Sequence, residues 1–215
     1  MRLAKAYITA LLILLSVGAY AESIPQNAYN EALARKPDTL NGEQLFAACA
    51  VCHGRDGGGV KDGTVPAIAG QHWQVLSKQL LDFRYFRRWD PRMVNLSSTD
   101  HLRGPQEIAD VVAYINSLPP PSARGIGTGE YADHGAGVYT RLCASCHGAE
   151  AKGDGTKGYP RLAGQQYAYL VRQIHDAVEG RRPTFSHQHI RLLEPLDFMD
   201  IQGIADYLAR LEPRS

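Results

Sequence analysis

The chain has 215 residues, of which 23 are lysine or arginine and 22 are aspartate or glutamate. This length suits either one large domain or two domains of roughly 100 residues each. Because the charges nearly balance, the composition argues against a protein that binds nucleic acid by neutralising its phosphates.

The first 21 residues have the pattern of a secretory signal peptide. Arg2 and Lys5 precede an uncharged, leucine-rich stretch that closes on an Ala-Tyr-Ala sequence. A signal peptidase requires small residues at the two alanine positions, so we expect cleavage before Glu22. The stretch falls short of the roughly 20 apolar residues that span a bilayer, which disfavours an uncleaved membrane anchor.

The rest of the chain is a tandem repeat with a period of 94 residues. The pairs that match under this shift are Cys49 and Cys143, Cys52 and Cys146, His53 and His147, Pro66 and Pro160, Gly70 and Gly164, Gln71 and Gln165, Gln79 and Gln173, and Asp82 and Asp176. One register without gaps predicts two domains that share a fold. The predicted organisation is an N-terminal extension at 22–40, a first domain at 41–118, a proline- and glycine-rich linker at 119–130 and a second domain at 131–215.

Both halves have apolar residues at helical spacing, most clearly over 108–118 and 201–211. The other predicted helices cover 42–52, 71–87, 137–146 and 165–179. Alternation typical of β-strands is missing from the sequence, so the predicted fold is all-α. Three or four short helices in each domain cannot close a substantial core, and we therefore expect another group to fill the centre of each domain.

Each half contains one C-x-x-C-H sequence. The two motifs are Cys49-Ala50-Val51-Cys52-His53 and Cys143-Ala144-Ser145-Cys146-His147. This sequence is the attachment signature of c-type haem, because two thiols at this spacing reach the vinyl groups on one edge of a porphyrin. The adjacent imidazole is then carried under the iron as its proximal ligand. The motifs predict two covalently bound haem c groups, with His53 and His147 as iron ligands.

A disulfide, a thioredoxin-like redox pair and a zinc site are the alternatives for cysteines at this spacing. They fit two identical C-x-x-C-H copies poorly, since each copy opens a helical repeat that lacks its own core. The two motifs use all four cysteines of the chain, so no free thiol is left to act as a nucleophile.

From about Gly42 to Leu211 the sequence resembles the dihaem class I cytochromes of the cytochrome c4 type. The segments that carry the resemblance, besides the haem motifs, are 66–72 and 160–165, which look like the P-x-L-A-G-Q sequence of that family, and 108–114 and 204–207, which look like its terminal helix. The resemblance implies single-electron transfer in the bacterial periplasm, by a soluble or peripherally membrane-associated protein. The implied partners are an upstream dehydrogenase or quinol-oxidising complex and a downstream oxidase or reductase. It also implies that the carbonyls of Pro66 and Pro160 accept hydrogen bonds from the proximal histidines.

The distal iron ligands are where the chain departs from that family, which has methionine in both domains. Met93 follows Asp82 by 11 residues, as the distal methionine of the family follows its matching acid, so Met93 is the predicted ligand of the first haem. In the second domain this place holds histidine. Counting 11 from Asp176 gives His187, whereas matching the methionine-led segment of the family gives His189. Residues two apart point to largely opposite sides, so only one faces the iron, and we favour His189.

A bis-histidine second haem would have a lower potential than a haem with a methionine ligand. We therefore expect an electron carrier, not an enzyme, whose second haem accepts the electron and whose first haem delivers it. The remaining methionine, Met199, is predicted to be a core residue. The arginines at 84–92 and 181–182 fit propionate pairing, docking onto an acidic partner or a solvated helix face.

Two other functions remain as alternatives. One is a dihaem enzyme, of the peroxidase or thiosulfate-oxidising type, in which one haem has an exchangeable site. The chain lacks the extra length that resemblance to dihaem peroxidases would require, and it has no cysteine left to act as an unusual distal ligand. The other is a cytochrome subunit of a larger dehydrogenase or reductase complex, which differs in its partner but not in its chemistry.

Overall fold

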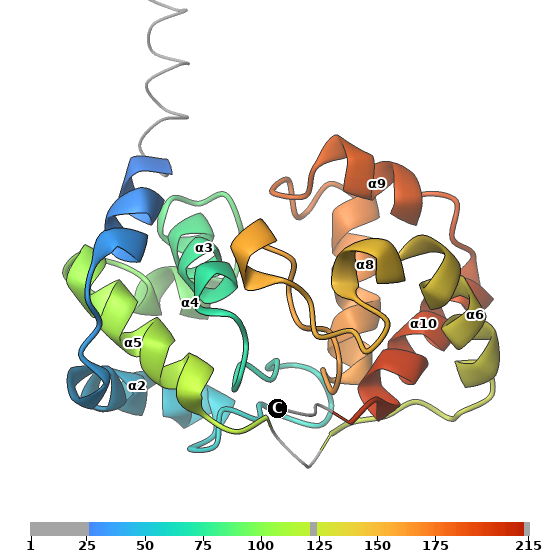
Figure 1. Cartoon of the computed structure of the whole chain (residues 1–215), viewed down its shortest axis with the longest axis horizontal. Helices are drawn as coiled ribbons and strands as arrows, with labels where there is room; N and C mark the ends of the chain where they lie inside the picture. The colour runs from blue at the N-terminus through green and yellow to red at the C-terminus, as the bar shows by residue number, and fades with distance from the viewer. Residues whose placement is uncertain (1–25, 121–123, 213–215) are drawn as a thin grey trace, which may run out of the picture.

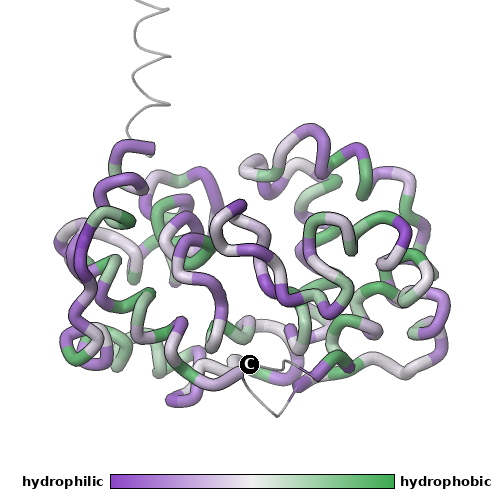
Figure 2. Tube along the Cα trace, viewed as in Figure 1, coloured by the Kyte–Doolittle hydropathy of each residue, from purple (hydrophilic) through white to green (hydrophobic). Residues whose placement is uncertain are grey.

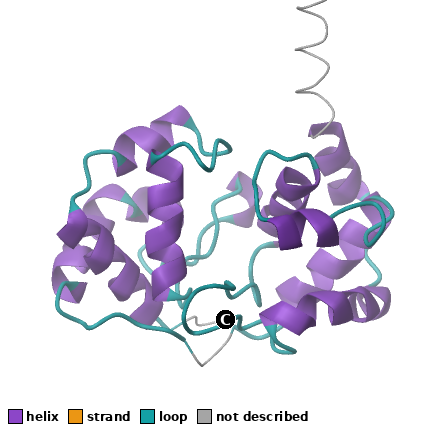
Figure 3. Ribbon diagram, turned by 180° about the vertical axis from the view of Figure 1, so that it is seen from behind, coloured by secondary structure: helices purple, strands orange, loops and turns teal. Residues whose placement is uncertain are grey.

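The computed structural model describes residues 26–120 and 124–212, and these form two helical domains side by side (Figure 1). Helices and loops make up the described part of the chain, in which one isolated bridge between Asp154 and Tyr159 is the sole β-type pairing (Figure 3). The all-α prediction is therefore confirmed.

The first domain contains a helical segment at 26–34 followed by four helices. These are α2 (Thr39–His53), α3 (Trp73–Arg84), α4 (Pro91–Leu96) and α5 (Pro105–Ser117). The segment at 26–34 belongs to the predicted N-terminal extension, and its Ala32 is fully buried in the core of this domain. The described part of the extension is thus packed onto the domain.

The second domain repeats this order with one difference in its first helix. Its elements are α6 (Ala132–Leu142), α7 (Ala144–His147), the short 3₁₀ helix η1 (Gly155–Lys157), α8 (Tyr167–Val178), α9 (His187–Leu193) and α10 (Phe198–Arg210). The single helix α2 of the first domain corresponds to α6 and α7 here, because the chain leaves helical geometry at Cys143, where φ is −114°. Helix η1 extends towards α3 of the first domain.

The two short helices α4 and α9 were not predicted from the sequence. Asp90 caps α4 by accepting hydrogen bonds from the backbone nitrogens of Arg92 and Met93, and Pro91 occupies the first turn, where its missing N–H costs nothing. Ser186 caps α9 through the backbone nitrogen of His189. A side-chain cap therefore begins each of the helices that carry the predicted distal ligands.

The first and last helices of each domain cross at close range. A Cβ atom on Gly42 of α2 would lie 2.1 Å from the carbonyl oxygen of Asp110 in α5. In the second domain, a Cβ atom on Gly135 of α6 would lie 1.9 Å from the carbonyl carbon of Gly203 in α10. Only glycine allows this approach. The crossing fixes the end of the first helix, and therefore the C-x-x-C-H motif, relative to the last helix.

The apolar faces of the last helices form the two cores. In α5 the buried positions include Ile108, Val111, Val112 and Ile115, and in α10 they include Ile201, Ile204, Ala205 and Leu208. Figure 2 shows hydrophobic and hydrophilic residues alternating along the helices, as burial of one face requires. The prediction for Met199 was wrong: its side chain is 46% exposed, because it lies on the outer face of the first turn of α10.

Two predicted segments are only partly described. The signal peptide at 1–21 lies outside the described residues. Of the linker at 119–130, the described part from 124 onward follows the second domain, where Gly125 donates to the side chain of Gln166 at 2.6 Å and accepts from the backbone nitrogen of Tyr167 at 2.9 Å. Among the described helices, none has the length and apolar character needed to cross a bilayer.

Candidate functional site

A cavity of about 620 Å³ lies between the helices of both domains and is lined mainly by apolar surface. The predicted site residues that line it are Cys49, Cys52, His53, Pro66, Met93, Cys143, Cys146, His147, Pro160 and His189. Residues that are 94 positions apart in the sequence thus face a shared interior. The fold brings all of these predicted residues together and leaves out His187.

In the first domain, helix α2 runs through the whole C-x-x-C-H motif. Cys49 and Cys52 are half-buried, and His53, the last residue of the helix, is only 5% exposed. Gly54 then turns the chain away with a φ of 77°, a backbone conformation that favours glycine. Burial raises the pKa of Cys49 to about 11, so this thiol is protonated near neutral pH.

In the second domain the motif begins at the break between α6 and α7. Cys143 occupies the break, Cys146 is exposed, and His147 ends α7 with 7% exposure. Gly148 ends the helix as Gly54 does, with a φ of 81°. Burial raises the pKa of Cys143 to about 11. The two motifs therefore present the same groups to the cavity from slightly different backbones.

Both proximal histidines are held by a backbone carbonyl. The Nδ1 atom of His53 lies 2.9 Å from the carbonyl oxygen of Pro66, and the Nδ1 atom of His147 lies 3.1 Å from that of Pro160. A carbonyl only accepts, so each Nδ1 carries the proton and each Nε2 keeps a free lone pair. Burial lowers the pKa of both imidazoles, which favours the neutral form that binds metals.

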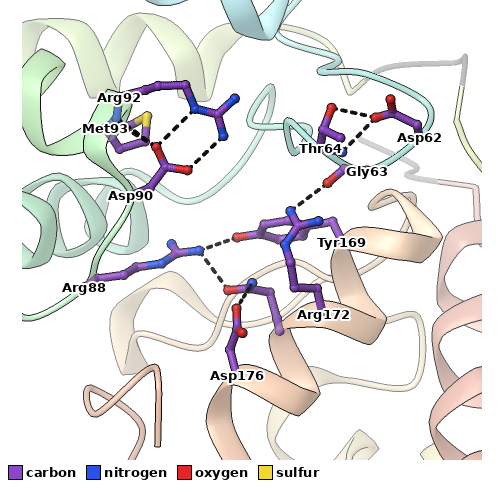
Figure 4. A network of polar contacts seen from close by, with 11 residues as sticks. Asp62, Gly63, Thr64, Arg88, Asp90, Arg92, Met93, Tyr169, Arg172 and Asp176 are labelled. Atoms are coloured by element: carbon purple, nitrogen blue, oxygen red, sulfur yellow. Dashed lines mark hydrogen bonds and ion pairs between the residues drawn. The ribbon is translucent and has the colours of Figure 1, made fainter. Parts of the chain in front are cut away.

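Met93 lies in the second turn of α4 and is half-buried against the cavity. Its position is set by Asp90, which caps the helix and also binds the guanidinium of Arg92 at 2.8 Å (Figure 4). This ion pair lowers the pKa of Asp90 through the hydrogen bond from Arg92. The cap therefore remains charged over the physiological pH range.

His189 lies in α9 with its ring centroid 6.1 Å from that of His147. The ring of Phe185 packs edge-on against it at 4.7 Å. Burial lowers the pKa of His189 to about 4, with further contributions from His147 and Arg182, so its imidazole is neutral. His187 is exposed in the first turn of the same helix and does not line the cavity.

The groups that line the cavity fit a covalently attached haem in each domain. A nitrogen–metal bond of about 2 Å on each side, with the radius of both rings, separates two imidazoles that share one metal by about 6 Å, which agrees with the distance between His147 and His189. The apolar lining suits a porphyrin face. None of the described residues form a cluster of three or more further metal ligands, so the zinc alternative has no ligand set.

The sequence did not reveal a set of crossed contacts between the domains. The side chain of Gln71 binds both backbone groups of Arg161, at 2.9 Å each, and the side chain of Gln165 binds both backbone groups of Ala67, at 2.9 and 2.8 Å. Each glutamine thereby holds the residue that follows the histidine-binding proline of the other domain. The 94-residue repeat indicated that these positions are equivalent, but not that they meet.

A second crossed pair follows directly in sequence. The Nε2 atom of His72 lies 2.8 Å from the carbonyl oxygen of Lys152, and the Nε2 atom of Gln166 donates to the carbonyl oxygen of Gly58 at 2.8 Å. His72 and Gln166 are again 94 positions apart. The domain interface is therefore polar and specific where it passes beneath the two histidine-binding loops.

Comparison with known proteins identifies the fold. The sequence model of the family described as cytochrome c matches residues 40–119 and 132–212. The thiosulfate dehydrogenase electron acceptor of Stutzerimonas stutzeri (strain A1501) is 32% identical over 179 residues, which are 76% of this chain and 79% of that protein. Cytochrome c4 of Pseudomonas aeruginosa is 29% identical over 184 residues, or 81% of this chain and 89% of that protein.

The crystal structure of reduced recombinant cytochrome c4 from Pseudomonas stutzeri matches the fold with a TM-score of 0.73 at 27% identity, covering 82% of this chain and 100% of that one. The predicted resemblance is confirmed, and two C-x-x-C-H motifs agree with the two haems of these relatives. The chain belongs to the cytochrome c family, as a dihaem electron-transfer cytochrome of the c4 type with two covalently bound haem c groups.

Proposed function

We propose that this protein is a periplasmic carrier that takes single electrons from a dehydrogenase and passes them through its two haems to a second redox protein. The observation that carries the proposal is the shared cavity, into which the C-x-x-C-H motifs of both domains open. Two haems that meet in one apolar interior suit transfer of an electron within the chain. Periplasmic location rests on the predicted signal peptide at 1–21.

The proposed attachment is by thioether bonds, with Cys49 and Cys52 holding the first haem and Cys143 and Cys146 the second. His53 and Met93 are the proposed ligands of the first iron. The support is their common exposure to the cavity and the hydrogen bond that orients His53 through Pro66.

For the second iron we propose His147 and His189. The distance between their rings, the neutral state of both imidazoles and the exposure of His187 support this pair over the alternative with His187. Because a methionine ligand raises the potential of a haem relative to a second histidine, the first haem would have the higher potential. The electron would then enter through the second haem and leave from the first.

The proposed donor is a dehydrogenase that oxidises a small substrate and hands over electrons one at a time. A relative that is named as the electron acceptor of thiosulfate dehydrogenase supports this class of donor. The proposed acceptor is a terminal oxidase or reductase. A cytochrome subunit built into such a complex is the second candidate, and co-purification of the chain with a partner would favour it.

The ligand assignment is tested in protein produced by a host that attaches haem c. Intact-mass measurement should show two haems. Near-infrared spectra of the oxidised protein should show sulfur-to-iron charge transfer for one haem only. The His189→Met variant should add a second such signal, whereas the matched control His187→Met should not. Two methionine-type signals in the wild-type protein would contradict the assignment.

The enzyme alternative is tested separately, because it needs an exchangeable position on one iron. Steady-state assays with peroxide and with thiosulfate should show no turnover above that of free haem. Carbon monoxide added to the ferrous protein should leave both haem spectra unchanged. Turnover of either substrate, together with binding of carbon monoxide to the second haem, would make the protein an enzyme.

A further inference from the structure

Four side chains from equivalent positions of the two domains meet between α3 and α8, and we call them the arginine junction: Arg88 and Gln79 of the first domain, and Arg182 and Gln173 of the second. The Oε1 atom of Gln79 accepts from Arg88 at 2.6 Å and from Arg182 at 3.0 Å. The Oε1 atom of Gln173 accepts from both arginines at 2.8 Å. Arg88 also donates to the hydroxyl of Tyr169 at 2.8 Å (Figure 4).

The arginine junction gathers positive charge without an anion beside it. Two guanidinium groups that share the same two oxygens lie close to one another, and both oxygens belong to neutral amides. Burial and the neighbouring Arg88 lower the pKa of Arg182 to about 10. The nearby acids have other partners among the described residues: Asp82 pairs with Lys78 at 2.5 Å, and Asp176 pairs with Arg181 at 2.8 Å.

One donor of the junction has no acceptor. The Nε atom of Arg182 is buried and makes no hydrogen bond within the described part of the chain. Buried donors of this kind are rare in folded proteins, and they indicate a missing partner. The guanidinium planes are nevertheless fixed, since Arg88 lies 4.6 Å from the ring centroid of Phe83 and Arg182 lies 4.4 Å from that of Phe185.

Both arginines and both glutamines line the cavity that contains the two C-x-x-C-H motifs. A haem c carries two propionate carboxylates on the edge opposite its attached vinyl carbons. A rigid guanidinium fork binds a carboxylate with two parallel hydrogen bonds, and such charge-assisted bonds are the strong ones. The junction therefore offers the missing anions a site that is already oriented.

We infer that the arginine junction binds propionate carboxylates from both haems and thereby places the two irons in one common charge environment. This inference rests on the proposed function, because it requires a haem in each domain. Since each glutamine holds both arginines, removing one guanidinium alters the field at both haems. The junction is thus a positioning and tuning element shared by the two redox centres, and neither domain contains it alone.

The test uses holoprotein with the substitutions Arg88→Gln and Arg182→Gln. Each should lower both midpoint potentials in a redox titration, because a lost positive charge destabilises the reduced haems. The matched control is Arg87→Gln, which removes an exposed guanidinium one position away and should titrate as the wild type does. Wild-type potentials in the two junction variants would overturn the inference.

A second measurement needs only the wild-type protein. Carboxylates held by arginine stay ionised, so both potentials should be independent of pH between pH 6 and 8, whereas in the junction variants they should fall as pH rises. A wild-type potential that declines with pH in this range would also overturn the inference. Intact mass separates this outcome from failure of the proposed function, since a protein without haem has no potentials to compare.

Discussion

Phe86 and Gly180 occupy equivalent positions in the two domains and share the same left-handed backbone conformation, with φ of 57° and 72°. Each follows the last turn of its helix, α3 or α8. Glycine adopts this conformation freely, whereas a residue with a Cβ atom pays roughly 1–2 kcal/mol for it. The first domain therefore carries backbone strain that the second domain avoids.

The substitution Phe86→Gly should raise the free energy of unfolding by about 0.5–1 kcal/mol, because it relieves this strain. Little packing is lost, since the ring is 68% exposed and stacks only on the exposed ring of Trp89 at 6.1 Å. Urea unfolding followed by circular dichroism measures the change. The converse substitution Gly180→Ala should lower stability by about 1 kcal/mol, and a loss of stability in Phe86→Gly would show that the ring has an unrecognised packing role.

Gln165 should contribute to stability through its two bonds to the backbone of Ala67. The substitution Gln165→Ala leaves a half-buried N–H and carbonyl without partners, so we expect a loss of about 1–3 kcal/mol. The same urea experiment should show the two domains beginning to unfold separately. The control is Gln26→Ala, whose exposed side chain bonds only Asn30 and should change stability by less than about 0.5 kcal/mol. Equal effects of the two substitutions would contradict the importance of the crossed contacts.

Asp206 should be the most sensitive position of the second domain outside the haem site. Its buried carboxylate accepts from the backbone nitrogens of Gly127 at 2.9 Å and Gly129 at 2.6 Å, and it pairs with Arg210 at 2.8 Å. The substitution Asp206→Ala removes all three bonds and should lower the free energy of unfolding by about 3–5 kcal/mol. Thermal unfolding provides the measurement. The exposed residue Asp133 gives the control Asp133→Ala, and a small effect at Asp206 would refute this account of how 124–130 is held.

The start of α10 should respond to acid through Asp200. The hydrogen bond from His134, at 2.7 Å, lowers the pKa of this carboxyl below that of an unfolded chain, about 3.9. A lowered pKa contributes stability that is complete above the unfolded value and is lost as the pH falls through the folded value. NMR titration should therefore give a higher carboxyl pKa for Asp200 in His134→Ala than in the wild type. The exposed His175 supplies the control His175→Ala, which should leave Asp200 unchanged.

The sequence was informative wherever chemistry or periodicity was local. The C-x-x-C-H motifs indicated both haems, and the apolar spacing at 108–118 and 201–211 indicated α5 and α10 to within a few residues. Helices α4 and α9 were missed because six or seven residues are too few to show a helical period. Their signals are instead the caps Asp90 and Ser186, which are visible in the sequence but common in loops as well.

Contacts between the domains could not be predicted from the repeat. A period of 94 residues shows that Gln79 and Gln173 have the same role, yet it does not show which surface of one domain faces the other. The break at Cys143 was also missed, because helix propensity changes little between the first motif and the second. The choice of His189 over His187 was available only through the resemblance, whereas the structure separates them directly by exposure.

The crossed contacts of Gln71 with Arg161 and of Gln165 with Ala67 have the form of a twofold-symmetric interface, in which one patch meets a second copy of itself. Homodimers are built in this way. The chain thus has the architecture of two subunits fused end to end, and the linker serves to keep them at a one-to-one ratio. Once the copies were joined, each could diverge at its own distal position, which a true homodimer of identical subunits cannot do.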